Sequence, residues 1–218
     1  PRILEHVVDT VLSFEGDRHH GLRMLRALKH RFGGTQELGL FEMTEAGLAG
    51  VPDASALFLS DRRPGASGSV VCPVLEGARP MLVEMQSLVV ETPAPMPRRT
   101  AQGFESGRLA LILAVLEKHA GVNTFGFDVF ASVAGGVKTN DTGADLGMAI
   151  AIASARNDQP VSDDTVAVGE IGLGGELRSV PQIDRRLHEA ARLGFTRAIV
   201  PASAPDVLGL ETLRVGSI

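Results

Sequence analysis

The chain contains 218 residues, of which 44% are hydrophobic and 22% charged, and its formal net charge is -5. This composition supports a buried core and excludes an intrinsically disordered chain. The negative charge excludes a uniformly basic coat for nucleic acid, although not a local basic patch. The single cysteine, Cys72, excludes an internal disulfide and a four-cysteine zinc site. No apolar run reaches the roughly 18 residues that a membrane helix needs, so no membrane partner is expected.

The first part of the chain contains short apolar runs. Residues 7–14 and 38–43 predict strands. Residues 22–33 remain ambiguous, because their leucines recur at helical spacing while they lie between two strand-like runs. Residues 52–59 fit either a short helix or a linker, and residues 61–69, rich in Gly, Ser and Arg with one Pro, predict a domain boundary.

Beyond this boundary, strand and helix patterns alternate without strict regularity, which predicts a mixed α/β fold. Strands are expected at 68–75, 80–90, 127–133, 165–171, 176–180 and 198–201. A helix capped by Thr100 is expected to extend to about Glu117. A nearly all-apolar helix at 141–155 and an amphipathic helix at 183–193, ended by Gly194, are expected to follow.

A basic segment extends from Asp17 to Arg31, with five Lys or Arg, three His and one acidic residue. Clustered arginines can bind phosphates in a bidentate way, but such a segment is equally consistent with a solvated surface. Lys29 and Arg31 would point to the same side of a strand, and the glycines that follow would let them project from a turn. These two residues are therefore the first candidates for phosphate binding.

Other motifs predict little chemistry within this chain. The Gly-Leu-Gly-Gly run at 172–175 lacks the Lys-Ser/Thr pair and the helix of a phosphate loop, so it predicts a hairpin turn. No Gly-x-Ser-x-Gly elbow occurs. The adjacent His19 and His20 would point apart on an extended chain, so no metal site is predicted. No cofactor is expected for this chain alone.

Two sets of motifs resemble the bacterial RadA (Sms) family. The segment at 29–33 is similar to the family's Lys-Asn-Arg-Phe-Gly signature, with His30 in place of asparagine, near the end of a RecA-like ATPase core. The motifs at 134–138, 144–147 and 169–176 resemble the Lon-protease-like domain (ribosomal protein S5 domain 2-like) that follows that core. The resemblance implies an ATPase-core end at 1–60, a linker at 61–69 and a Lon-like domain at 70–218.

The resemblance also implies that this chain is the C-terminal part of a longer protein. The start at Pro1 rather than Met agrees with that implication. A zinc module and the Walker A and B segments are then expected upstream, and ATP with magnesium is the cofactor expected for the full-length protein.

Lon proteases use a Ser nucleophile and a Lys base with a lowered pKa. In this chain the matching positions are Asp145 and Asp184, and carboxylates supply neither function. The domain is therefore expected to be proteolytically inactive, and two carboxylates close together would repel or share a proton. The alternative is a peptidase with a displaced dyad, for example Ser132 and Lys138.

The resemblance implies a DNA-dependent ATPase and helicase of recombinational DNA repair, which assembles as a homo-hexamer and drives branch migration in the cytoplasm. Its implied partners are single-stranded and branched DNA and the recombinase RecA. The Lon-like domain would be a scaffold for the ring. Lys29 and Arg31 would act in trans on a neighbour's ATP, where a cation stabilises transition-state charge.

Basic residues of the outer domain are candidate DNA contacts, since phosphate contacts dominate affinity for DNA. For each one alone, a solvated surface position is the simpler interpretation. The candidates are Arg98, Arg99, Lys138, Arg185 and Arg186. A module that only binds DNA is the third functional possibility.

Overall fold

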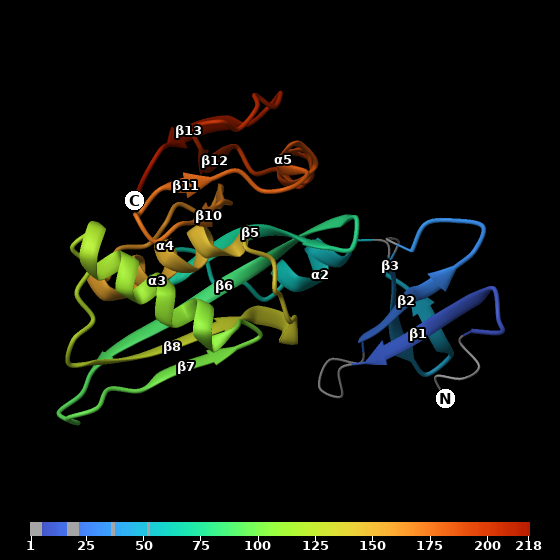
Figure 1. Ribbon diagram of the computed structural model, residues 1–218, viewed down its shortest axis with the longest axis horizontal. Helices are drawn as coiled ribbons and strands as arrows, with labels where there is room; N and C mark the ends of the chain where they lie inside the picture. Colours follow the sequence, from blue (N-terminus) through green and yellow to red (C-terminus); the bar gives the residue numbers. More distant parts are fainter. Residues whose placement is uncertain (1–5, 17–21, 36–37, 52) are drawn as a thin grey trace.

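The computed structural model describes residues 6–16, 22–35, 38–51 and 53–218, and these residues form a mixed α/β fold, as expected (Figure 1). A small antiparallel sheet comes first, with its strands adjacent in chain order. Its strands are β1 (Thr10–Gly16), β2 (Leu22–His30), β3 (Leu38–Thr44) and β4 (Gly47–Gly50).

Strand β2 resolves the ambiguous segment at 22–33. It pairs with β1 along one edge and with β3 along the other, so its backbone groups are bonded on both sides. Pairing with two neighbours outweighs the weak helical preference of its leucines, because strand formation depends on context more than on intrinsic propensity.

A short helix, α2 (Ala54–Leu59), follows the small sheet. The carboxylate of Asp53 caps it by accepting a hydrogen bond of 3.0 Å from the Ala56 amide. Helix α2 packs against strand β6 of the larger sheet, and its Phe58 joins a small apolar cluster. The cluster contains residues of both sheets, Leu40 and Met24 from the small one and Met81 from the large one. An ion pair between Arg26 and Glu76 also links the two sheets.

The larger sheet has seven strands in the order β13-β12-β9-β5-β6-β8-β7. Neighbouring strands are parallel except in the β5–β6 and β6–β8 pairs. The strands are β5 (Ser69–Glu76), β6 (Arg79–Glu91), β7 (Arg99–Gln102), β8 (Phe127–Val133), β9 (Thr165–Ala167), β12 (Arg197–Pro201) and β13 (Glu211–Val215). A separate two-stranded hairpin consists of β10 (Glu170–Ile171) and β11 (Leu177–Arg178) and encloses the glycine-rich turn, as predicted.

Helices cover both faces of this sheet. Alternating residues of β5 face two different cores: Val70 and Cys72 pack with α3 (Ser106–His119) and α4 (Ala144–Asn157), whereas Val71 packs with α5 (Ile183–Arg192). The predicted apolar helix corresponds to α4, which is buried on several sides. A short 3-10 turn, η1 (Ala134–Gly136), follows β8. Among the described residues, no helix is long and apolar enough to cross a bilayer.

The expected helix start at Thr100 is wrong. Thr100 lies in β7, which pairs in parallel with β8, and helix α3 begins only at Ser106. Gly103, with φ +72°, turns the chain between the two elements. The four residues of β7 are too few for their alternation to stand out from the helix pattern that follows.

Gly68 provides a test of the entry to β5. Its φ is +80°, and an added Cβ would lie 2.2 Å from the carbonyl oxygen of Ser87. Gly68→Ala is expected to lower the free energy of unfolding by about 2 kcal/mol or more, from backbone strain plus a clash. The control, Gly65→Ala, has a similar φ of +69° but open space around it, and is expected to cost only about 1 kcal/mol. Urea unfolding measures both, and equal costs would contradict the clash.

Candidate functional site

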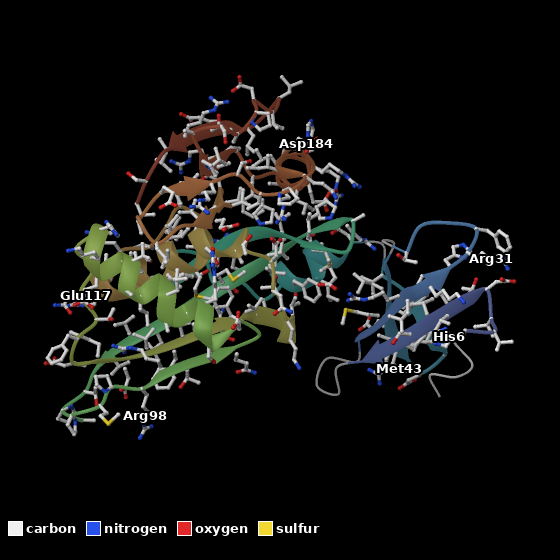
Figure 2. The ribbon with its side chains drawn as sticks, viewed as in Figure 1. His6, Arg31, Met43, Arg98, Glu117 and Asp184 are labelled. Carbon is white, nitrogen blue, oxygen red and sulfur yellow. The ribbon has the colours of Figure 1, made fainter. Side chains whose placement is uncertain are left out.

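The candidate phosphate-binding pair lies at one end of the small sheet. Lys29 belongs to the end of β2, and Arg31 follows it in a turn. Figure 2 shows Arg31 at the tip of the small sheet, on the side away from the large one. The Arg31 side chain is 69% exposed, so its guanidinium is accessible to a neighbouring molecule.

Both cations are held by the residues that precede β1. Lys29 Nζ donates a hydrogen bond of 2.7 Å to the carbonyl oxygen of Val8, and Arg31 Nη1 lies 3.1 Å from Asp9 Oδ1. His30 contacts Thr10 Oγ1 through Nδ1 at 3.1 Å. Contacts with residues 8–10 thus orient the side chains of residues 29–31. Residues 17–21, which begin the basic segment, lie outside the described residues.

The Asp145 carboxylate, at the first turn of α4, is fully buried and forms a salt bridge with Arg108 of α3. Arg108 Nε donates to Asp145 Oδ1 at 2.8 Å, and its Nη2 donates to Oδ2. The Ile171 amide donates to the same carboxylate at 3.1 Å. Burial raises the pKa of Asp145, while the hydrogen bond from Arg108 opposes that shift. This carboxylate connects α3, α4 and β10.

Asp184, the second position expected to match the Lon dyad, has a different environment. It lies exposed in the first turn of α5, where Figure 2 labels it. We find no contact between its carboxylate and that of Asp145 within the described residues, and Arg108 provides the charge partner that Asp145 needs. The expectation that the two carboxylates repel each other or share a proton is therefore not met within the described residues. Asp145 instead forms an ion pair with Arg108.

Arg186 is not available as a DNA contact, because its side chain is only 1% exposed. Its guanidinium pairs with Asp141 and donates to the carbonyl oxygens of Pro73 at 2.9 Å and Pro181 at 3.0 Å. Asp141 also accepts a hydrogen bond of 2.7 Å from the Leu75 amide. This buried network joins α5 to β5 and to the loop before α4, so the role of Arg186 is structural.

The remaining candidate DNA contacts differ in whether the side chain already forms hydrogen bonds within the protein. Arg99 donates to the carbonyl oxygens of Phe127 and Thr124, and Arg185 donates to Gln182 Oε1 at 2.8 Å. The side chains of Arg98 and Lys138 are exposed, and neither has a polar partner among the described residues. Of the five candidates, these two cations are exposed and have no side-chain partner in the described part of the chain.

The displaced peptidase dyad finds no geometric support. Ser132 is half-buried in β8, between Gln86 of β6 and Gln102 of β7. Lys138 lies in the loop after η1, and no hydrogen bond joins it to Ser132 within the described part of the chain. A base must lie within hydrogen-bond reach of its nucleophile, and this pair does not meet that condition.

Sequence reasoning missed Arg108 and Asp141, which complete the two buried ion pairs. Arg108 lies on an amphipathic helix and Asp141 in a loop, so neither had a local signal. Asp145 is the one acidic residue of the nearly all-apolar helix α4, and this is the one available sign that a cation must come from elsewhere in the fold.

Comparisons with known proteins match this chain to one family model and to several relatives of one name. The family model described as "Subunit ChlI of Mg-chelatase" matches residues 131–204, which include Asp145 and Asp184. The "DNA repair protein RadA" of Halalkalibacterium halodurans is 47% identical over 223 residues, which cover 98% of this chain and 49% of that protein. The proteins of the same name from Bacillus subtilis and Streptococcus pyogenes serotype M3 are 46% and 50% identical over 222 residues, covering all of this chain and 48% and 49% of their own lengths.

The chain therefore spans about half the length of the curated relatives it matches. Its similarity to them includes the small sheet, the large sheet and the helices that cover it, because the alignments extend over nearly every residue. The resemblance indicated by the motifs is confirmed: over nearly its whole length this chain is homologous to the proteins named DNA repair protein RadA.

Proposed function

We propose that this chain is the part of a RadA-type, DNA-dependent ATPase that supplies trans-acting cations to a neighbouring subunit. The exposed Arg31 at the tip of the small sheet carries the proposal, because a cation reaches another subunit's nucleotide only from an accessible position. Under this proposal, residues 1–60 end a RecA-like core, residues 61–69 link it to the next domain, and residues 70–218 form the Lon-like domain. ATP and magnesium would bind in the full-length protein.

The Lon-like domain is proposed to be a non-proteolytic scaffold for a hexameric ring. Support comes from Asp145, whose carboxylate is held in a buried ion pair at the position expected for a nucleophile. The ring would act in recombinational DNA repair and branch migration on single-stranded and branched DNA, with RecA as a partner. Arg98 and Lys138 are the proposed DNA contacts of the outer domain, and the proposed location is the cytoplasm.

The proposal predicts ATP-driven DNA unwinding by the full-length protein. Sedimentation velocity with magnesium and ATP is expected to show a hexamer, and a forked DNA substrate is expected to be unwound only when ATP is hydrolysed. A strict monomer at high concentration without unwinding would contradict the proposal. Casein degradation that survives Asp145→Ala but is lost in Lys138→Ala would instead establish the displaced-dyad peptidase.

A further inference from the structure

A cleft of about 1070 Å³ lies between the small sheet and the larger one. One wall is apolar and contains Met24, Leu40, Phe58 and Met81. The rest of the lining includes a polar wall, which consists of the end of β7 and the loop at 135–142. Small-molecule sites are typically concave and mostly apolar, with volumes of about 300–1,000 Å³ and a few polar groups that fix orientation. The cleft has about this volume, and it combines an apolar wall with a smaller number of polar groups.

Several polar side chains that line the cleft have no partner in the described part of the chain. Gln102, Lys138 and Asn140 are exposed and form no hydrogen bond or ion pair there. The Nε of Arg26 is buried and also unpartnered, although its Nη2 pairs with Glu76. A buried donor is ordinarily satisfied. Of these groups, only the Nε of Arg26 is a buried donor without a partner, whereas the three exposed side chains are hydrated and free to turn toward a ligand. Together they give the cleft N–H donors and one ammonium, which suit an anionic ligand.

The charge of the lining favours an anion. Two of the three cations are neutralised by lining carboxylates, since Arg26 pairs with Glu76 and Arg186 pairs with Asp141. Lys138 is left without a counter-charge among the described residues. The cleft is therefore positively charged at its polar wall and neutral at its apolar wall.

Two glycines shape the boundary between these walls. Gly135 and Gly136 have φ of +73° and +68°, and a Cβ added to Gly135 would lie 2.8 Å from the Phe58 ring. The missing side chain lets the aromatic ring lie against the backbone of the polar loop. Phe58 is the single aromatic residue of the lining, and the chain contains no Trp or Tyr.

We infer that this cleft binds a nucleotide unit, with the base against the apolar wall beside Phe58 and the phosphate at Lys138. Aromatic and apolar contact suits any base, and a cation with amide donors suits the phosphate. An acidic peptide fits less well, because β2, β3, β5 and β6, which form the walls, already pair along both edges and offer no edge for strand addition. The nucleotide could be free or part of a DNA strand, and only the second source rests on the proposed function.

The test uses 2-aminopurine as the probe, since a chain without Trp or Tyr contributes no overlapping emission. Fluorescence anisotropy is measured for 2-aminopurine deoxyriboside monophosphate and for an oligodeoxythymidylate that contains one 2-aminopurine. Saturable binding of either is expected, about tenfold weaker in Lys138→Ala, because a charge-assisted contact to phosphate is lost. The control, Lys118→Ala, removes the same charge from an exposed position of α3 outside the cleft and is expected to bind normally.

The two probes distinguish a free nucleotide from a nucleotide within a DNA strand. Binding of the monophosphate establishes a free nucleotide as a ligand, and binding of the oligonucleotide alone establishes a strand. Equal binding of the nucleoside without phosphate, equal losses in both lysine variants, or no binding would overturn the inference. So would Lys138-dependent binding of an acidic peptide in place of nucleotides. Lys138-dependent binding in a protein that fails to unwind DNA would refute the proposed function and leave this site standing.

Discussion

Arg31→Ala in the full-length protein is expected to lower the rate of ATP hydrolysis by about 10³-fold or more and to abolish DNA unwinding. An arginine supplied in trans stabilises the charge that develops during phosphoryl transfer, and its loss typically costs that much. The fold should tolerate the change, because the Arg31–Asp9 ion pair is exposed at both partners and such pairs stabilise a protein by about 1 kcal/mol or less. Steady-state ATPase and forked-DNA unwinding assays measure the effect.

A mixed-ring experiment tests whether the arginine acts on a neighbour. Subunits with Arg31→Ala keep their own nucleotide site, whereas subunits with a disabled phosphate loop keep Arg31. Mixing the two inactive proteins is expected to restore part of the hydrolysis if the arginine acts across the interface. Arg63→Ala, which removes an exposed arginine without a partner among the described residues, is the control. Wild-type hydrolysis by the Arg31 variant would overturn the assignment.

Asp145→Ala is expected to lower the free energy of unfolding by about 3–5 kcal/mol. Removing one partner of a buried ion pair leaves the other charge without compensation, and that cost exceeds the value of the pair itself. Here the stranded charge would be Arg108, and the Ile171 amide would lose its acceptor as well. Urea unfolding followed by circular dichroism measures the loss.

Asp184→Ala is the matched control, because the same side chain is removed from an exposed first turn of a helix. Its expected cost is under about 1 kcal/mol, the value of a favourable interaction with the helix dipole. A double-mutant cycle with Arg108→Ala isolates the pair and is expected to show strong coupling. Similar costs for the two aspartate variants, or additivity with Arg108→Ala, would contradict the buried-pair interpretation.

Local patterns predicted most of the fold because each element carries its own signal. The β5–β6 hairpin, β8, α4 and α5 lie close to their expected positions, since their apolar residues repeat at the period of the element. The sequence at β7 favours the start of a helix, and the sequence at β2 fits a helix or a strand, because short strands depend on neighbours that are distant in the sequence. The mixed α/β class did not depend on either segment.

The candidate site was less predictable, because its contacts connect distant parts of the chain. Lys29 and Arg31 could be selected from a contiguous motif. The burial of Arg186 could not, since its partners Asp141 and Pro73 come from other elements 45 and 113 residues away. The cleft likewise depends on how two sheets face each other, and no sequence period reports that arrangement.

Two aspartates near the start of α4, each paired with an arginine, also restrict which substitutions the sequence tolerates. Asp141 is held by Arg186 of α5, and Asp145 is held by Arg108 of α3. A serine at position 145 would leave Arg108 without its carboxylate partner, at a cost in stability that the loss of that arginine would relieve. Selection acting on one substitution at a time meets a loss of stability before any gain of chemistry. The ion pair between Arg108 and Asp145 thus opposes the appearance of a serine at position 145 by a single substitution.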